Sequence, residues 1–165
     1  MEQQTVKGKY PEKTYFELSD ILTTFAMMEN AGTMHRDYGT GTLYTPAEVH
    51  TISYIAAHPG CSNSQISAAF AKTLGATSQV LNRLKKKDLI RVEKNKSNRK
   101  ILEVYLTEQG DTLDKAHRKM DTEIWAPIVE YLKEKFSEEE INTAFSVIER
   151  LLHFGDDSAF AEPKE

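Results

Sequence analysis

The stretch of sequence that decides the fold runs from Ser62 to Gly110 and reads SNSQISAAFAKTLGATSQVLNRLKKKDLIRVEKNKSNRKILEVYLTEQG. Ser62 and Gln65 stand three residues apart as a capping pair, which predicts a short helix after Ser62. Thr73 begins a second helix, whose inward side is expected to carry residues at spacings of three and four, namely Thr77, Val80, Leu81 and Leu84. Two short helices joined by such a tight link predict a helix-turn-helix.

A two-stranded hairpin is expected directly after these helices. A polar run with Asn95, Ser97 and Asn98 is flanked by apolar residues on both sides. Those before the run are Leu89, Ile90 and Val92, and those after it are Ile101, Leu102, Val104 and Leu106. The order strand, polar tip, strand predicts a wing next to the second helix.

Longer helices are predicted on both sides of this region. The capping pair Thr14 and Glu17 begins a helix that is expected to run from residue 15 to about residue 34. Thr45 begins another, over residues 46–57, and the glycine-containing segment 37–44 separates the two. After the hairpin, Thr107 caps a long helix that Pro127 is expected to bend. The capping pair Ser137 and Glu140 begins the last helix.

The sequence therefore predicts a mainly α-helical chain with a small β-wing. A winged helix-turn-helix domain would be flanked by N- and C-terminal dimerisation helices. The expected parts are a flexible arm (1–14), a dimerisation helix (15–36), the winged helix-turn-helix DNA-binding region (45–110), further dimerisation helices (111–154) and a tail (155–165).

Charge is distributed unevenly along the chain. The segment from Lys72 to Lys100 carries a net charge of +8, whereas the rest of the chain carries −12 and the whole chain −4. This division suits a protein that presents one face to a polyanion and keeps its other faces away from it. Double-stranded DNA is the expected partner.

Composition argues for a cytoplasmic protein. No apolar run approaches the roughly 18–20 residues that a membrane span needs, and the first residues lack the apolar stretch of a signal peptide. Cys61 is the only cysteine, so no internal disulfide can form. We interpret Cys61 as a small buried residue, and the alternative is a redox-sensitive thiol near a helix start.

The order of these elements resembles the MarR family of bacterial regulators. In that family the second short helix usually ends in Arg-Leu, a basic run and Gly-Leu-Ile, and residues 83–90 read RLKKKDLI here. The family's wing ends in Val-x-Leu-Thr-x-x-Gly, and residues 104–110 read VYLTEQG. The resemblance implies a winged-helix transcriptional regulator without catalytic activity or a cofactor.

The sequence departs from the family pattern at three places. The wing has Asn98, Arg99 and Lys100 where Asp-Arg-Arg is common, so the acid that usually fixes an arginine is missing. Asp88 replaces a glycine that closes the helix in a left-handed conformation, which aspartate tolerates better than most residues. Gln79 replaces a frequent arginine, and base preference is expected to differ accordingly.

The exposed side of the second short helix is expected to enter the major groove. Gln79 and Asn82 are the expected base readers, because their amides pair bidentately with adenine, while the hydroxyl of Ser78 is ambivalent. Arg99 is the strongest candidate on the wing, where it would enter the minor groove. The predicted DNA contacts are Thr73, Gly75, Ser78, Gln79, Asn82, Arg83, Lys86, Asn98, Arg99 and Lys100.

A homodimer is expected, with residues 15–25, 124–132 and 141–154 packing across a two-fold axis. Such a dimer would bind a pseudo-palindromic operator with half-sites about one DNA turn apart, and we expect it to act as a repressor. The resemblance also suggests that a small molecule relieves repression. Its expected contacts are Met34, His35, Tyr38, Tyr54 and Trp125.

Two alternatives remain at this stage. A metal-responsive regulator would use His117 with Asp114 and Asp121, which lie one helical turn away on either side. A winged helix that docks onto protein instead of DNA would bind with little dependence on salt. Catalysis is not expected, because the sequence has no glycine-rich phosphate loop and no nucleophile motif.

Overall fold

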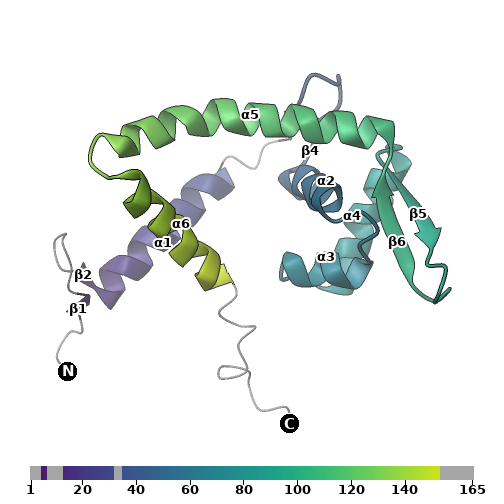
Figure 1. The fold of residues 1–165 in the computed structure, drawn as a ribbon, viewed down its shortest axis with the longest axis horizontal. Helices are drawn as coiled ribbons and strands as arrows, with labels where there is room; N and C mark the ends of the chain where they lie inside the picture. Colours follow the sequence, from purple (N-terminus) through teal and green to yellow (C-terminus); the bar gives the residue numbers. More distant parts are fainter. Residues whose placement is uncertain (1–4, 7–12, 32–34, 153–165) are drawn as a thin grey trace, which may run out of the picture. The chain divides into compact units, whose positions relative to one another are not determined.

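The computed structural model describes residues 5–6, 13–31 and 35–152, which contain six helices and three two-stranded sheets (Figure 1). The chain forms two compact units that divide after His117. The long helix α5 (Glu108–Lys133) begins in the first unit and continues into the second, which also contains α6 (Glu138–Leu152). The predicted class, mainly α-helical with a small β-wing, is confirmed.

Residues 44–117 of the first unit form a winged helix around one apolar core, and we call them the reading head. Its helices are α2 (Pro46–Ala57), α3 (Asn63–Ala69), α4 (Leu74–Lys86) and the start of α5. The wing pairs β5 (Ile90–Lys94) with β6 (Leu102–Leu106) in antiparallel register. The core residues Ile52, Ile66, Leu84 and Leu113 are each fully buried. Burying one such side chain contributes about 1.5–3 kcal/mol to folding.

The predicted helix starts are confirmed by hydrogen bonds. Thr45 and Glu48 form a complete capping box at α2, and Ser62 and Gln65 form one at α3. The Thr73 side chain accepts a hydrogen bond from the backbone N–H of Ala76. Each of these oxygens satisfies an N–H that has no partner within its helix. The other two predicted boxes, Thr14 with Glu17 and Ser137 with Glu140, are also formed.

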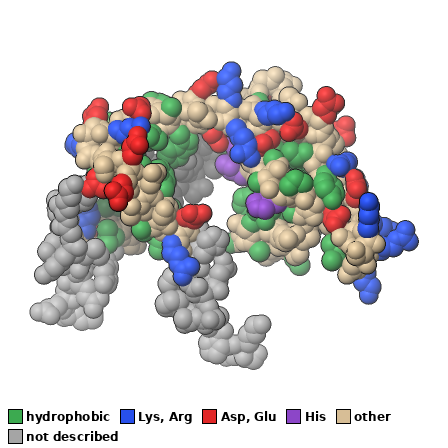
Figure 2. Space-filling view, viewed as in Figure 1, with side chains coloured by type: hydrophobic (Ala, Val, Ile, Leu, Met, Phe, Trp, Pro, Cys, Tyr) green, Lys and Arg blue, Asp and Glu red, His purple; other side chains and the backbone are tan. Residues whose placement is uncertain are grey.

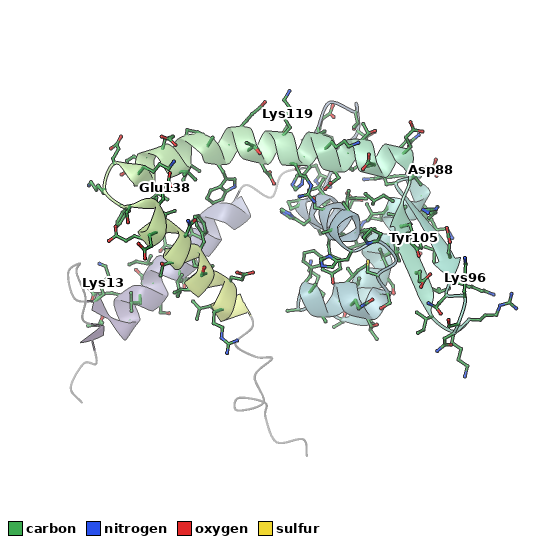
Figure 3. The ribbon with its side chains drawn as sticks, in the orientation of Figure 1. Lys13, Asp88, Lys96, Tyr105, Lys119 and Glu138 are labelled. Carbon is green, nitrogen blue, oxygen red and sulfur yellow. The ribbon has the colours of Figure 1, made fainter. Side chains whose placement is uncertain are left out.

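The end of α4 has the geometry that the family resemblance implied. Asp88 takes a left-handed conformation with φ +55°. The backbone N–H of Leu89 donates to the carbonyl of Leu84 at 3.0 Å, and that of Asp88 donates to Lys85 at 3.1 Å. These two bonds form a Schellman motif, which turns the chain from the helix into the wing. Asp88 lies at the base of the hairpin and Lys96 at its opposite end (Figure 3).

Gly110 on the first turn of α5 allows that helix to approach the base of the wing. A Cβ atom at this position would lie 2.1 Å from the carbonyl oxygen of Leu89. Thr107 fixes the same junction, because its hydroxyl donates to the carbonyl of Asp88 and accepts from the N–H of Gly110. The motif that carried the resemblance therefore joins the wing to α5.

Two short hairpins were not predicted from the sequence. β1 (Thr5–Val6) pairs with β2 (Lys13–Thr14), and β3 (Arg36–Asp37) pairs with β4 (Leu43–Tyr44). The Asp37 carboxylate closes the second hairpin by accepting hydrogen bonds from the backbone N–H groups of Thr40 and Gly41. Strands of two residues are too short to show an alternating pattern.

The remaining helices are close to the predicted ranges. α1 (Tyr15–Ala31) begins where predicted, and residues 32–34 at its expected end lie outside the described residues. α5 continues through Pro127 as one helix. Among the described residues, no helix is both long and apolar enough to span a membrane.

Apolar side chains on α1, on the second half of α5 and on α6 remain exposed within the chain. On α1 they are Phe16, Ile21, Leu22, Phe25 and Met27. On α5 and α6 they are Ile124, Ile128, Tyr131, Phe145, Val147, Ile148 and Leu151. Faces of this kind mark an interaction surface, because single soluble domains rarely expose so many large apolar residues together.

Cys61 is buried at the edge of the wing, where its backbone pairs with that of Val104. Burial raises the pKa of its thiol. A buried thiol with a raised pKa is a poor nucleophile, which supports the interpretation of Cys61 as a core residue.

Candidate DNA interface

α4 is the candidate recognition helix, and its two faces differ as the spacing predicted. Thr77, Val80 and Leu84 are buried against the core, while Leu81 is half-buried. The opposite face exposes Gly75, Gln79, Asn82, Arg83 and Lys86. Ser78 is half-buried at the border between the faces. The structure thus brings six of the predicted contacts together along one side of one helix.

The first turn of α4 is open to an approaching ligand. No atom lies within 4 Å of the position that a Cβ on Gly75 would occupy. Thr73 is exposed, and its hydroxyl caps the helix. The remaining N–H groups of this turn carry the partial positive charge of the helix dipole, which favours a phosphate.

A buried carboxylate holds the other end of α4. Glu48 on α2 is 1% exposed, and its Oε1 accepts a hydrogen bond from Lys87 Nζ at 2.9 Å. Nε of Arg83 lies 3.6 Å from the same oxygen. The Lys87 ammonium also lies over the Tyr44 ring, 4.6 Å from its centre. Lys87 therefore joins α4 to α2, and it is distinct from the exposed Lys85 and Lys86.

The environment of Glu48 keeps it ionised. Burial by itself would raise the pKa of this carboxyl, but hydrogen bonds from Thr45 and Lys87 and the charge of Lys87 outweigh that effect. The net result is a lowered pKa. An ionised Glu48 gives Lys87 and Arg83 a fixed counter-charge at neutral pH.

The wing tip is ordered by asparagine side chains in place of the missing acid. Oδ1 of Asn95 accepts hydrogen bonds from the backbone N–H groups of Ser97 and Asn98 at 2.9 and 2.7 Å. Oδ1 of Asn98 accepts from the N–H of Lys100, and Nδ2 of Asn95 donates to Glu103. This network replaces the acid–arginine pair of the family pattern.

Positive charge gathers at that tip. Asn98, Arg99 and Lys100 are all exposed there, together with Lys96. Figure 2 shows the blue side chains grouped at the free end of the hairpin. Arg91 belongs to the body of the wing, because its guanidinium lies 4.7 Å from the Tyr105 ring centre and 3.1 Å from a Glu93 oxygen. Its charge is therefore partly neutralised within the wing.

The family comparison decides what this combination of helix and wing is. Residues 44–101 match the model of the MarR family. Over these residues the reading head is similar to the MarR family. The predicted resemblance to the MarR family is thereby confirmed over residues 44–101, whereas the motif at residues 104–110 lies outside the matched range.

Solved structures of bacterial proteins share the fold over most of the chain. FabT of Streptococcus pneumoniae, solved in complex with DNA, is 25% identical with a TM-score of 0.60, and the match covers 86% of this chain and 94% of FabT. The zinc-responsive MarR family member ZitR of Lactococcus lactis is 20% identical with a TM-score of 0.58, over 82% of this chain and 97% of ZitR. The adhesin competence repressor AdcR of Streptococcus pyogenes is 16% identical with a TM-score of 0.59, over 85% of this chain and 96% of AdcR. No curated protein matches the chain.

The effector residues predicted from the MarR resemblance are distributed over both units of the chain. Met34 lies outside the described residues, and His35 is exposed. Tyr38 and Tyr54 are half-buried in the first unit, and Trp125 is half-buried in the second. The Tyr54 ring stacks on that of His58 at 4.3 Å. The effector site therefore stays a prediction.

A cavity of about 440 Å³ lies within the reading head between α2, α3 and α4. Its walls include Ile66, Phe70 and Val80, with His50 and Lys72 also contributing. None of the predicted effector residues is among its lining residues.

The histidine of the metal-responsive alternative is part of a buried polar cluster. Asp114 and His117 are 5% and 4% exposed. The Ser53 hydroxyl donates to Asp114 at 2.7 Å and lies 3.1 Å from Nδ1 of His117. The rings of Tyr38 and His50 pack edge-on against the His117 ring. Within the described residues, no three His, Cys, Asp or Glu side chains are grouped as metal ligands.

Two contacts that position α4 were not predicted from the sequence. The only local sequence signal at Glu48 is its place three residues after Thr45, and its pairing with Lys87 spans 39 positions. Asn63 was not singled out, although its amide reaches Ser78 on α4. One sequence signal could have identified Asn63. It follows Ser62, which already caps the helix, so the Asn63 amide is not needed as a cap.

Proposed function

We propose that this MarR-family chain is a sequence-specific regulator that binds double-stranded DNA as a homodimer on a pseudo-palindromic operator. The observation that carries the proposal is the exposed face of α4. It presents Gln79 and Asn82 between an open helix start and the cations Arg83 and Lys86. Amides in the middle of the face read base edges, and cations at its end neutralise phosphates.

The wing supplies a second contact of a different kind. Arg99 and Lys100 are exposed on a tip whose backbone is fixed by Asn95 and Asn98. A guanidinium on such a tip suits the narrow minor groove, where the negative potential is strongest. The strongly positive segment from Lys72 to Lys100 includes α4 and the first strand and tip of the wing.

The proposed dimer uses the exposed apolar faces of α1, α5 and α6. Phe25, Ile128 and Leu151 are 51%, 40% and 50% exposed within one chain. A second copy would bury such faces across a two-fold axis and place two recognition helices on successive major-groove faces. We further propose that the protein acts in the cytoplasm as a repressor, which is what the name of AdcR says of that protein. A small molecule would relieve this repression.

DNA affinity measured against salt concentration tests the proposal. Purified protein is titrated into random-sequence and selected duplexes, and fluorescence anisotropy gives the dissociation constant at each salt concentration. We expect affinity to fall steeply with salt, because phosphate neutralisation releases counterions. Binding that ignores salt, or binding to protein partners alone, would contradict the proposal and support a protein-docking winged helix.

Arg99→Ala tests the wing separately. We expect operator affinity to fall at least about tenfold with an unchanged melting temperature, because the side chain is exposed and contacts DNA alone. Lys119→Ala, which removes an exposed cation from α5, is the matched control and is expected to keep full affinity. Equal affinities for both variants at matched salt would remove the wing from the interface.

A further inference from the structure

The side chain of Asn63 connects the helix-turn-helix to the border of the recognition face. Asn63 is the first residue of α3, and Ser78 lies on the second turn of α4. Nδ2 of Asn63 is 2.8 Å from Oγ of Ser78 and 3.3 Å from the carbonyl oxygen of Leu74. The amide thus contacts a side chain and a backbone carbonyl of the same helix.

The Leu74 carbonyl decides which way round the amide lies. A carbonyl oxygen can only accept, so the group that faces it must be the NH₂ of Asn63. The two protons of that NH₂ serve the two acceptors, Leu74 O and Ser78 Oγ. Oδ1 of Asn63 faces the other way, is buried and has no hydrogen-bond partner in the part of the chain that the structure describes.

This orientation removes the ambivalence of Ser78. A serine hydroxyl has one proton to donate and lone pairs to accept with. In this structure Oγ of Ser78 accepts a hydrogen bond from Nδ2 of Asn63. An amide NH₂ group can only donate, so this nitrogen cannot accept a hydrogen bond from the Ser78 hydroxyl. The Ser78 O–H therefore does not donate to Nδ2 of Asn63, and Ser78 borders the side of α4 that exposes Gln79 and Asn82.

We propose that Asn63 fixes Ser78 as a hydrogen-bond donor, so that Ser78 selects a base with an acceptor on its major-groove edge. This inference rests on the proposed function. Guanine presents N7 and O6, adenine N7 and thymine O4, whereas cytosine presents only the N4 amino donor. The base opposite Ser78 in each half-site is accordingly any base except cytosine. Asn63 is a positioning residue, and Ser78 makes the contact.

Selection from a pool of random duplexes tests this proposal. The wild type is compared with Ser78→Ala, which removes the donor, and Asn63→Asp, whose carboxylate can only accept and so turns the Ser78 O–H inward. Gln65→Glu adds the same negative charge two positions away and keeps the capping box, since a carboxylate also accepts from the N–H of Ser62. Binding of the selected duplexes is then measured with each base at every position.

Cytosine should be disfavoured by the wild type at one position per half-site by roughly threefold to tenfold, the value of a single neutral hydrogen bond. Ser78→Ala should lose this preference at that position alone. Asn63→Asp should reverse it in favour of cytosine or adenine, whose amino groups donate to the exposed Ser78 oxygen. Gln65→Glu should keep the wild-type preference and lose only overall affinity.

Each other outcome overturns the inference in a recognisable way. If the wild type selects no motif, the proposed function fails together with the inference. If the wild type selects a motif that Ser78→Ala leaves unchanged, only the inference fails. If Ser78→Ala relaxes one position while Asn63→Asp behaves like Gln65→Glu, Ser78 reads the base without direction from Asn63. A purely structural role of Asn63 would lower stability without changing any base preference.

Discussion

The reading head and the flanking helices use the same rules of capping and spacing, yet they differ in what covers their apolar residues. Ile52, Ile66 and Leu84 of the head are fully buried within the chain. Phe16 on α1 and Leu151 on α6 are 78% and 50% exposed. The difference indicates that the fold of the head is determined within one chain, whereas the flanking helices need a second surface to bury their apolar faces.

The largest expected effect in the head comes from Gly110→Ala. The added Cβ would lie 2.1 Å from the backbone carbonyl oxygen of Leu89, which no side-chain rotation can relieve. The base of the wing and the start of α5 would have to separate. We expect a loss of about 3 kcal/mol or more in the free energy of unfolding, measured by urea denaturation.

Gly75→Ala is the matched control for that substitution. Its Cβ would meet no atom within 4 Å, and alanine favours a helix over glycine. A gain of about 0.5–1 kcal/mol is expected. Equal stability of the two variants would mean that the wing junction is not tightly packed, and the contrast between head and flanking helices would weaken.

The next effect concerns the flanking helices. Ile148→Asp places a charge on the apolar side of α6, where Ile148 is 43% exposed in one chain. If a second copy covers this face, the dimer should weaken by about 2 kcal/mol or more, which is roughly thirtyfold in its dissociation constant. Sedimentation equilibrium gives this constant, and the melting transition of the head should be retained in the resulting monomer.

Ser146→Asp adds the same charge to the opposite side of α6. Its serine hydroxyl bonds only within the helix, to the carbonyl of Asn142. We expect the dimer of this variant to resemble that of the wild type. A wild type that is monomeric at high concentration would instead show that these faces are covered by some other partner.

Sequence reasoning predicted the head well, because its signals are local. The capping boxes, the inward spacing on α4 and the left-handed Asp88 each involve residues within seven positions of one another. Long-range pairs lack such a signal. Glu48 and Lys87, or Asn63 and Ser78, are brought together only when α2, α3 and α4 pack around the core.

The predicted DNA contacts show the same limit. The spacing on α4 predicted which side is exposed, but it could not predict that Lys87 is paired with Glu48 while Lys86 remains exposed. The wing lacks the acid that usually fixes an arginine in the family pattern. The hydrogen bonds of Asn95 supply an alternative that no family pattern would have suggested.

Glu48→Gln tests how far the buried ion pair stabilises the head. The amide keeps an acceptor for the N–H of Thr45 but removes the charge that faces Lys87. We expect a loss of about 2 kcal/mol at neutral pH, the value of a hydrogen bond to a charged group in a partly buried site. The same substitution on an exposed acid, Glu139→Gln on α6, should change stability little.

The pH dependence of stability provides a second readout of this pair. The pKa of Glu48 is lowered in the folded protein relative to its usual value of 4.5. Its contribution is therefore complete above pH 4.5 and is lost as the pH falls through the lower folded value. The stability difference between wild type and Glu48→Gln should shrink on acidification below pH 4.5. A constant difference would show that the charge of Glu48 does not stabilise the fold.

The smallest expected effect is that of Ala71→Gly in the link between α3 and α4. Ala71 has φ +48°, and among the described non-glycine residues only Asp88 shares a positive φ. A left-handed alanine costs about 1–2 kcal/mol, and glycine removes this strain. The greater freedom of glycine in the unfolded chain costs about 0.4–1 kcal/mol of folding free energy and offsets part of the gain. A net gain of about 0.5 kcal/mol is expected in urea denaturation.

The sign of that change sharpens the contrast between the two regions. Both strained positions lie in the reading head, at the two ends of α4, so strain is tolerated where the core fixes the backbone. If Ala71→Gly destabilises the protein, the Ala71 side chain must itself support the tight link between the helices. If Ala71→Gly stabilises the protein while DNA affinity falls, a rigid link between α3 and α4 is needed to orient α4 for entry into the groove.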